Sequence, residues 1–151
     1  MTDFHIAQMN IARAKAPLND PLMAGFATRL AEINALAEQS AGFVWRPTAP
    51  EGDAYIQPYD DERILVNMSV WETIEHLRQY VYRSTHAEFL RPRHTWFEKL
   101  TGAYLTLWWI PAGHQPSMDE TKQRLAYLEA HGPSPFAFTF SKHFSAEQAA
   151  V

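Results

Sequence analysis

The sequence predicts an α+β domain in which strands and helices follow the order β-α-β-β-α-β-α-β. Three observations predict this class. The chain has 151 residues, which suits one domain with a core of its own. Apolar residues alternate in some segments and recur every three to four residues in others, and prolines and glycines separate these segments. We therefore expect one domain over residues 1–151, with a βαββαβ unit followed by an added helix and strand.

The first third of the chain is expected to contain a strand, a helix and a second strand. Residues 4–11 alternate loosely between apolar and polar side chains, as strand residues do. Asp20 can cap a helix that carries Pro21 at its first position, and Gly42 lies where that helix should end. Residues 43–46 then form a short strand that ends at a proline.

The middle of the chain has the clearest strand and a helix that is expected to break. The strand of residues 64–71 has one apolar face and one face that mixes polar and aromatic groups, namely Leu65, Asn67, Ser69 and Trp71. Residues 72–82 have helical apolar spacing. Thr85 and Glu88 have the spacing of a capping box, which predicts that a helix restarts there, and Pro92 should end or bend it.

The last third of the chain is expected to add a strand, a helix and a final strand. Residues 104–110 are β-branched and aromatic enough for a buried strand. Ser117 begins a second capping box, and the helix after it should stop at Gly132. Residues 136–140 alternate phenylalanine with smaller side chains, which predicts a last strand. Residues 145–151 are small and polar and are expected to be frayed.

Composition and spacing exclude several classes of function. Thirteen basic against 17 acidic side chains, without a basic run, argue against nucleic-acid binding. The absence of cysteine excludes disulfides and thiolate metal sites. The seven histidines lack metal-ligand spacing, so we expect no metal site and interpret Glu72 and His76 as a helix contact. Without a long apolar stretch or a signal-peptide pattern, we expect a cytoplasmic protein with no membrane partner.

One set of residues has the chemistry of a ligand site: Asn67, Ser69, Trp71 and Arg91, with His86 and Arg93 as neighbours. An amide, a hydroxyl and an indole on one strand face can hold a planar, oxygen-bearing ligand. Arg91 could stabilise a developing enolate or phenolate. The residues alone favour a structural interpretation over this one, in which Trp71 fills a dimer core, Asn67 satisfies a backbone group and the arginines make surface pairs.

The predicted order of elements raises the question of what covers each face of the sheet. Helices on one face alone leave the other face bare. Asn67, Ser69 and Trp71 are expected on that bare face, and a second copy of the chain would cover it.

Long segments of the chain also carry a family resemblance. They are MNIARAKAPLNDPLMAGFATRLAEINALAEQSAGFVWR, NMSVWETIEHLRQYVYRSTHAEFLRPRHTWF, LWWIPAGHQP and HGPSPFAF. They resemble a family of bacterial domains of unknown function that belongs with the antibiotic-biosynthesis monooxygenase-like proteins of the dimeric α+β barrel superfamily. The resemblance covers nearly the whole chain. It implies a ferredoxin-like protomer, a homodimer formed through the sheet face, and a ligand cavity between each sheet and its own helices. It leaves open which face of residues 64–71 lines that cavity.

The superfamily also suggests roles for particular residues. Members that oxidise polycyclic phenols without a cofactor place an asparagine and a tryptophan four apart on a strand, and an arginine on the following helix. Asn67, Trp71 and Arg91 occupy the matching positions, whereas Leu77 replaces a tyrosine of those enzymes. The resemblance implies a cofactor-independent monooxygenase that acts on a small hydrophobic or aromatic molecule. His86 could serve as its base, since the pKa of imidazole lies near neutrality.

Two alternatives remain open at this point. Haem-degrading relatives use a first-strand asparagine and a second-helix aromatic residue, which Asn10 and Tyr80 could supply. Their histidine position falls near residues 90–91, which argues against haem degradation, although His86 could still be an axial haem ligand. The other alternative is a non-catalytic ligand-binding or dimerisation module.

Trp108, on the predicted strand 104–110, is a further expected ligand contact.

Overall fold

The fold is an antiparallel sheet between two layers of helices. The computed structural model describes residues 3–17, 19–47, 59, 61, 63–86, 96–98 and 103–149, the side chains of residues 84–86 excepted. Its strands are β1 (Phe4–Ala14), β2 (Phe43–Trp45), β3 (Ile64–Trp71), β4 (Phe97–Glu98) and β5 (Leu105–Pro111). Its helices are α1 (Ala24–Gln39), α2 (Ile74–His86), α4 (Met118–His131), α5 (Ala146–Ala149) and the 3-10 helix η1 (Pro21–Met23).

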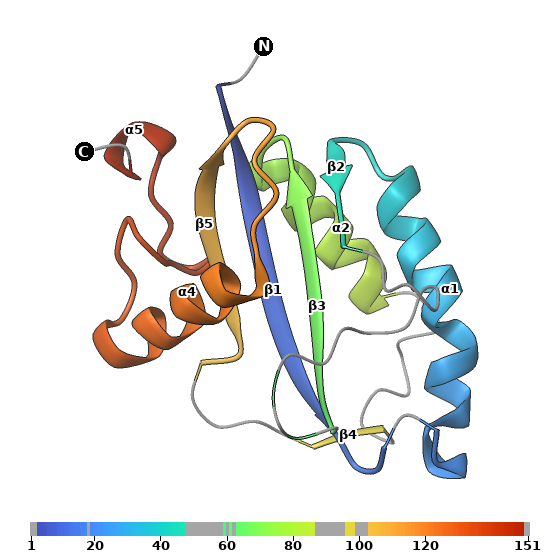
Figure 1. Ribbon diagram of the computed structural model, residues 1–151. Coiled ribbons are helices and arrows are strands. Elements are labelled where there is room, and N and C mark those ends of the chain that lie inside the picture. Colours follow the sequence, from blue (N-terminus) through green and yellow to red (C-terminus); the bar gives the residue numbers. More distant parts are fainter. Residues whose placement is uncertain are drawn as a thin grey trace.

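Strand β1 lies at the centre of the sheet (Figure 1). Along one edge it pairs with β3, and along the other it pairs with β5 and then, at Arg13 and Ala14, with β4. Strand β2 pairs with the outer edge of β3, and all of these pairings are antiparallel. The order β2-β3-β1-β5, with α1 and α2 as the connections, is the ferredoxin-like βαββαβ arrangement. The predicted α+β class and core topology are thus confirmed.

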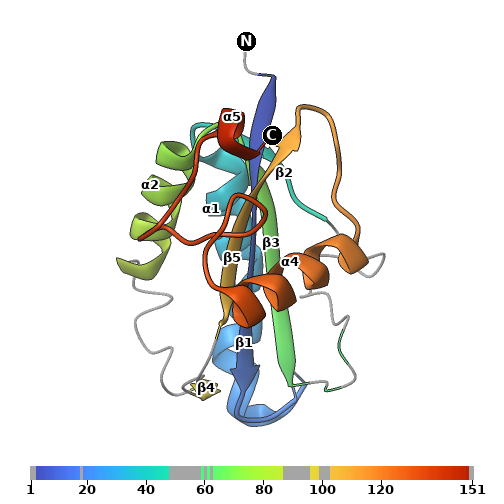
Figure 2. The same ribbon diagram turned by 90° about the vertical axis from the view of Figure 1, so that its left-hand side faces the viewer.

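The helices lie on both faces of the sheet, not on one. Helices α1 and α2 cover one face and α4 lies across the other, over β5 and β1 (Figures 1 and 2). The expectation that one face has no helix is therefore wrong. Helix α4 packs there because its buried residues include Leu125, which joins Trp108 and Ile110 in an apolar cluster on that face. Burying these side chains together is what favours this placement.

Several helix ends follow the local chemistry that predicts them. Asp20 Oδ1 accepts a hydrogen bond from the backbone N–H of Leu22, 2.9 Å away, at the start of η1, which leads into α1. Gly42 follows α1 with a φ of 82°, and the ring of His76 fills the space that a side chain there would need. Ser117 caps α4 by accepting from the backbone N–H of Glu120 at 3.1 Å. These three predictions are confirmed.

Other predicted elements differ from the structure. Residues 136–140 do not form a strand. Phe138 makes one bridge, to Leu107, with two backbone hydrogen bonds of 2.8 and 2.9 Å, and the chain turns at 134–137. Only Phe138 of the alternating phenylalanines is fully buried, so the pattern marks one anchor and not a paired strand. Helix α2 continues through Thr85, so Thr85 is not the cap of a new helix, while Glu88 and Pro92 lie outside the described residues.

Two short elements were not predicted from the sequence patterns. Strand β4 is only two residues long, too short to show an alternation. Residues 146–149, within the tail expected to be frayed, form the short helix α5. Its start is held by Ser145, whose backbone N–H donates to Gln148 Oε1 at 2.8 Å. Among the described helices, none is long and apolar enough to span a membrane.

Candidate functional site

The strand pair β1–β3 carries a row of polar side chains on the face toward α1 and α2. In the antiparallel register, Asn10 lies opposite Asn67, Gln8 opposite Ser69 and Ile6 opposite Trp71. Trp71 packs in one apolar cluster with Leu77 of α2 and Ala37 of α1, which identifies this face as the helix-covered one. Asn67, Ser69 and Trp71 therefore do not lie on a bare face. The period of two along a strand puts the amides and the hydroxyl on the same side as Trp71.

Hydrogen bonds join the polar row into one network. Gln8 Nε2 donates to Asn67 Oδ1 at 3.0 Å and to Ser69 Oγ at 2.8 Å. Asn10 Nδ2 donates to Gln8 Oε1 at 3.0 Å and, at a longer 3.4 Å, to Asn67 Oδ1. At the other end, Trp71 Nε1 donates to Ser69 Oγ at 2.7 Å. Every predicted residue of this row is thus brought together, and Gln8 is the residue that links them.

Trp71 is the inner end of the row and belongs to the core. Its side chain has no exposed surface, stacks on Tyr80 at 4.9 Å between ring centroids, and meets Phe43 edge-on at 5.5 Å. Its indole N–H is already bonded to Ser69. Trp71 therefore fills the core between the sheet and its own helices, and not the dimer core that the structural interpretation expected. Burial raises the pKa of Tyr80 to about 12, so its hydroxyl stays protonated at neutral pH.

Asn10 and Asn67 form the outer end of the row, where both side chains are half-buried. Gln8, which holds both of them, is only 2% exposed, and Ser69, which accepts from Gln8, is 3% exposed. Among the described residues, no acceptor lies within hydrogen-bonding distance of Asn67 Nδ2, and no donor lies within such a distance of Asn10 Oδ1. Within the described part of the chain, the pair therefore presents one unpaired donor beside one unpaired acceptor, and the hydrogen bonds from Gln8 hold both amides in this orientation.

Of the remaining predicted residues, Trp108 lies elsewhere, and the side chains of the others are outside the described part of the chain. Trp108 is on the opposite face of the sheet, where its Nε1 donates to Glu120 Oε2 at 3.0 Å, and the other carboxylate oxygen of Glu120 lies 2.7 Å from His114 Nε2. His86 ends α2, and its side chain is outside the described residues. Arg91 and Arg93 also lie outside them. The structure therefore does not bring Trp108 to the polar row.

Gln8 was missed by the sequence reasoning, although a signal for it exists. Gln8 and Asn10 are the polar positions on one side of the first strand, between the apolar residues Ile6 and Ala12. Two polar residues at a spacing of two mark a face, just as Asn67 and Ser69 do on β3. Pairing the two marked faces would have required the register of β1 against β3, which only the sheet provides.

The spacing of the histidines predicted no metal site, and the structure gives the positions of the described His, Asp and Glu side chains. Within the described part of the chain, no group of three His, Asp or Glu side chains is placed to hold a metal ion. His76 Nδ1 lies 2.8 Å from Thr73 Oγ1, and its backbone N–H donates to the same oxygen at 3.1 Å. The described hydrogen bonds of His76 thus fasten the start of α2 and do not reach Glu72.

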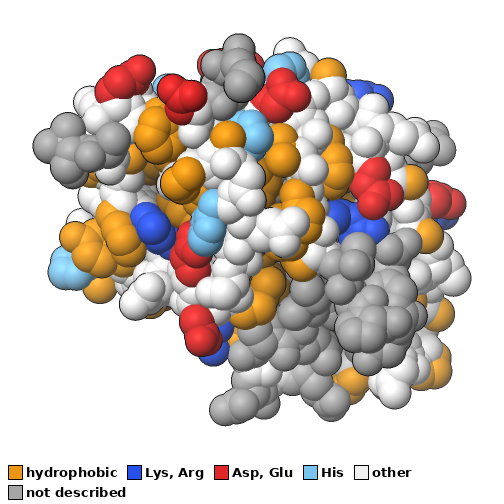
Figure 3. Space-filling model, turned by 45° about the horizontal axis from the view of Figure 1, so that its top comes forward, with side chains coloured by type: hydrophobic (Ala, Val, Ile, Leu, Met, Phe, Trp, Pro, Cys, Tyr) orange, Lys and Arg blue, Asp and Glu red, His pale blue; other side chains and the backbone are white. Residues whose placement is uncertain are grey.

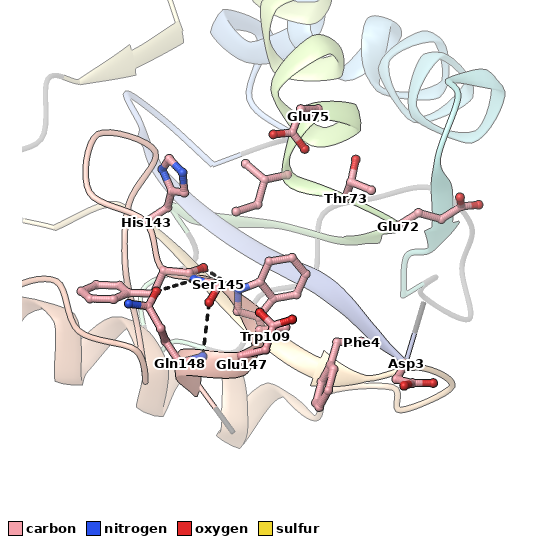
Figure 4. Close-up of a pocket in the computed structure, with 13 residues that line it drawn as sticks. Asp3, Phe4, Glu72, Thr73, Glu75, Trp109, His143, Ser145, Glu147 and Gln148 are labelled. Carbon is pink, nitrogen blue, oxygen red and sulfur yellow. Dashed lines mark hydrogen bonds between the residues drawn. The ribbon is translucent and has the colours of Figure 1, made fainter. Parts of the chain in front are cut away.

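A cavity of about 830 Å³ lies at the end of the sheet, between α5 and the start of α2. Its lining includes Phe4, Ile74, Trp109 and Phe144, and its carboxylates are Asp3, Glu72, Glu75 and Glu147. Figure 4 shows Trp109 within the lining, with Glu75 on one side and Glu147 on the other. The indole of Trp109 is held by donating to the backbone oxygen of Phe144 at 2.7 Å. Figure 3 shows hydrophobic side chains bordered by acidic ones on this end of the molecule. None of the predicted site residues whose side chains the structure describes lines this cavity.

Comparison with known proteins gives several structural similarities. No match was found among the curated proteins. SnoaB, a cofactor-independent oxygenase from Streptomyces nogalater, is 15% identical over 74% of this chain and 95% of its own, with a TM-score of 0.44. PA3566 from Pseudomonas aeruginosa is 11% identical over 76% of this chain and 99% of its own, with a TM-score of 0.46. At TM-scores this low, neither similarity carries an argument about what this chain does.

A further structure and a family model complete the comparison. A Chloroflexus aurantiacus protein provisionally described as an antibiotic biosynthesis monooxygenase is 13% identical over 75% of this chain and 97% of its own, with a TM-score of 0.41. The model of a family described as a domain of unknown function (DUF3291) matches residues 5–151. This match spans nearly the whole chain, and it confirms the prediction of a family whose members have no assigned function. The chain belongs to the DUF3291 family.

Proposed function

We propose that the chain binds a small planar molecule, aromatic or polycyclic, through Asn10 and Asn67 on the helix-facing side of the sheet. One observation carries this proposal: two half-buried amides stand side by side with a donor and an acceptor that no described residue pairs, and both are held by Gln8, which is almost completely buried. A ligand whose edge offers the complementary groups would satisfy both atoms at once.

The way the pair is supported favours a binding role. Polar groups in a buried sheet face cost free energy unless each is hydrogen-bonded, and the inner members of the row meet that condition. Because these hydrogen bonds already hold the amides in one orientation, less conformational entropy is lost when a ligand binds. Leu105, which is half-buried and lies opposite Asn10 on β5, offers apolar surface next to the pair.

The finer proposal, which rests on the family resemblance, is cofactor-independent oxygenation of an aromatic or polycyclic substrate. A substrate CH₂ group conjugated with a carbonyl loses a proton, the resulting carbanion passes electrons to dioxygen, and one oxygen atom of the dioxygen becomes a new carbonyl while the other leaves as water. The amide N–H of Asn67 would stabilise the negative oxygen that develops on the substrate carbonyl. Trp71 would act through Ser69 and not by contact, because its indole N–H is already bonded.

Proton and charge handling are assigned to predicted residues whose side chains lie outside the described part of the structure. His86 is proposed as the base and Arg91 as the group that favours the deprotonated substrate. Tyr80 is not proposed as a base, because burial raises its pKa to about 12. The proposed ligand contacts are thus Asn10 and Asn67, with Ser69 as their support.

Asn67→Ala tests the proposal most directly. The probe is dithranol, a tricyclic anthrone whose carbanion reacts with dioxygen, and the measurements are oxygen uptake and appearance of the quinone. Removing one donor that stabilises an oxyanion costs about 10²–10³ in rate, so we expect a loss of that order. Val66→Ala, which alters the neighbouring residue on the opposite face, is the matched control and should retain activity. Equal rates for wild type and Asn67→Ala would contradict the oxygenase proposal.

A second candidate function is ligand binding without turnover. The described side chains that hold the pair are the amide of Gln8 and, next to it, the hydroxyl of Ser69. Such groups bind and orient a ligand but do not transfer protons at neutral pH. Binding of a planar probe that is weakened by Asn67→Ala, together with no oxygen uptake above the buffer rate, would favour this candidate over the oxygenase.

The proposal includes a homodimer and no cofactor. The resemblance implies packing through the sheet face opposite Asn10 and Asn67, but α4 lies over that face and Met9, Val66 and Met68 there are at most 4% exposed within one chain, so the proposed dimer is not formed through bare strands there. Sedimentation of the purified chain tests the dimer, and a Soret band in its absorption spectrum would favour the haem alternative with His86 as the axial ligand.

A further inference from the structure

Gln8 lies in the middle of β1, is 2% exposed and contacts three other members of the polar row. We infer that Gln8 is a positioning residue that sets which atoms Asn10 and Asn67 present, and that the pair thereby selects ligands carrying a hydrogen-bond donor directly beside an acceptor. Lactams, enolised dicarbonyls and hydroxyquinones belong to this class. The inference rests on the proposed function, because it specifies the ligand of the same site.

The two ends of the Gln8 amide are chemically different, and both are used. Its nitrogen donates to Asn67 Oδ1 and Ser69 Oγ, and its oxygen accepts from Asn10 Nδ2. Asn67 therefore turns its oxygen inward and its amide nitrogen outward. Asn10 does the reverse, with its nitrogen inward and its oxygen outward. One buried amide thus imposes opposite orientations on two neighbouring amides.

The inferred preference for a donor beside an acceptor stays the same if the amides of Gln8, Asn10 and Asn67 all turn over together. If the Gln8 amide turned over, the Ser69 hydroxyl could donate to its oxygen while still accepting from Trp71 Nε1. Asn67 would then turn its nitrogen inward and Asn10 its oxygen inward. The outer surface would again present one donor and one acceptor, with their positions exchanged. A ligand edge with two acceptors would leave one amide unpaired in either arrangement, which costs affinity.

Packing alone does not explain why an amide side chain stands at position 8. Its nearest neighbours on the same face of β1 are the apolar Ile6 on one side and Asn10, which it orients, on the other, and an apolar residue at position 8 would pack beside Ile6 without the cost of burying an amide. The opposite face of β1 is filled in this way by Ala7 and Met9. The amide at position 8 is explained by the partners that it orients.

The experiment uses phenanthridinone, a planar tricyclic lactam, and N-methylphenanthridinone, in which the donor is blocked. Their dissociation constants are measured by fluorescence titration for wild type, Gln8→Met and Ser69→Ala, each first shown by its circular dichroism spectrum and melting curve to be folded. One satisfied hydrogen bond corresponds to about tenfold in affinity, so wild type should prefer the lactam by about that factor. Gln8→Met, which keeps the volume but has no amide, should bring the preference close to one.

Ser69→Ala and Met9→Leu complete the set of variants. Ser69→Ala removes one of the two groups that hold the Gln8 nitrogen, with little change of volume, and should lower the preference in part. Met9→Leu, a conservative change on the opposite face, should leave it at the wild-type value.

The outcomes separate this inference from the proposed function. If wild type binds both probes with equal affinity, or if Gln8→Met and Ser69→Ala both keep the full preference, Gln8 does not set selectivity, while the binding site itself stands. If wild type binds neither probe, the proposed binding function is contradicted and the inference falls with it. A preference that is lost in Gln8→Met and kept in Met9→Leu supports the inference.

Discussion

The two faces of the β1–β3 pair are built by the same two segments of chain and yet have opposite character. Toward α2 the pair carries Gln8, Asn10, Asn67 and Ser69, joined by hydrogen bonds. Toward α4 it carries Ala7, Met9, Val66, Met68 and Val70, which pack with Trp108 and Ile110 in an apolar cluster. Each strand alternates, so neighbouring residues serve different faces.

The difference indicates what each face contributes. The apolar face stabilises the fold by removing hydrocarbon from water, at about 25 cal/mol per Å². The polar row contributes little net free energy, because each of its hydrogen bonds replaces one with water, and a single bond is worth about 0.5–1.5 kcal/mol. We infer that one face mainly stabilises the domain and that the other orients polar groups for a ligand. Three predictions test that division, in addition to the experiments above.

The largest expected effect comes from removing the most deeply buried indole of each face. Trp71→Ala and Trp108→Ala should each lower the free energy of unfolding by about 3–5 kcal/mol, because both side chains are fully buried. Urea denaturation measures this loss. Only Trp71→Ala should also weaken the preference for the lactam probe, since Trp71 is hydrogen-bonded to Ser69. If Trp108→Ala weakens it as much, the two faces are coupled and the division is wrong.

A smaller effect is expected from Tyr80 at high pH. Burial raises the pKa of Tyr80 from 10.0 to about 12 in the folded protein, so the folded state holds this proton more tightly than the unfolded state. The corresponding stability is fully present below the unfolded pKa and is lost as the pH rises from there through the folded value. About 2–3 kcal/mol should be lost over this range.

Tyr80→Phe is the control for that loss. The variant cannot ionise at position 80, so its stability should fall less than that of the wild type over the same pH range, as measured by urea denaturation. Identical pH profiles for the two proteins would show that Tyr80 is not buried against Trp71 in solution.

The smallest effect is a contrast between adjacent residues on β3. Val66→Ala should destabilise the protein by about 1–2 kcal/mol, since it opens space in the apolar cluster. Asn67→Ala should change stability by only about 1 kcal/mol, because its side chain is half-buried, and yet it should weaken binding of the planar probe. Chemical denaturation and titration of both variants measure the contrast. Loss of binding in Val66→Ala with retention in Asn67→Ala would reverse the assignment of the faces.

Much of the fold could be predicted from local patterns, and the failures have a common origin. Strand 64–71 has the predicted bounds, and the helix start at Ser117 is as expected, because alternation and capping are properties of adjacent residues. The strand predicted at 136–140 failed because alternation does not reveal whether a partner strand is available. The expectation that one face of the sheet has no helix failed for a related reason, since the apolar stripe on α4 does not specify which face of the sheet the helix covers.

The candidate site shows the same boundary between local and tertiary information. Asn67, Ser69 and Trp71 were found from one strand, because a spacing of two puts them on one face. Trp108 was grouped with them although it lies on the other face of the sheet. Gln8, which joins the set, was missed because it is about sixty residues away in sequence and meets Asn67 and Ser69 only through the register of β1 on β3.

The α+β class, the order of the core elements and the polar character of one face of β3 follow from the sequence alone. These depend on periodicity and on residues near one another in the chain. The folded chain was needed to establish which face lies under α1 and α2, that α4 covers the other, and that Gln8 contacts both Asn10 and Asn67. Each of these depends on contacts between distant segments, whose free energy comes from burial and from hydrogen bonds that exist only after the strands have paired.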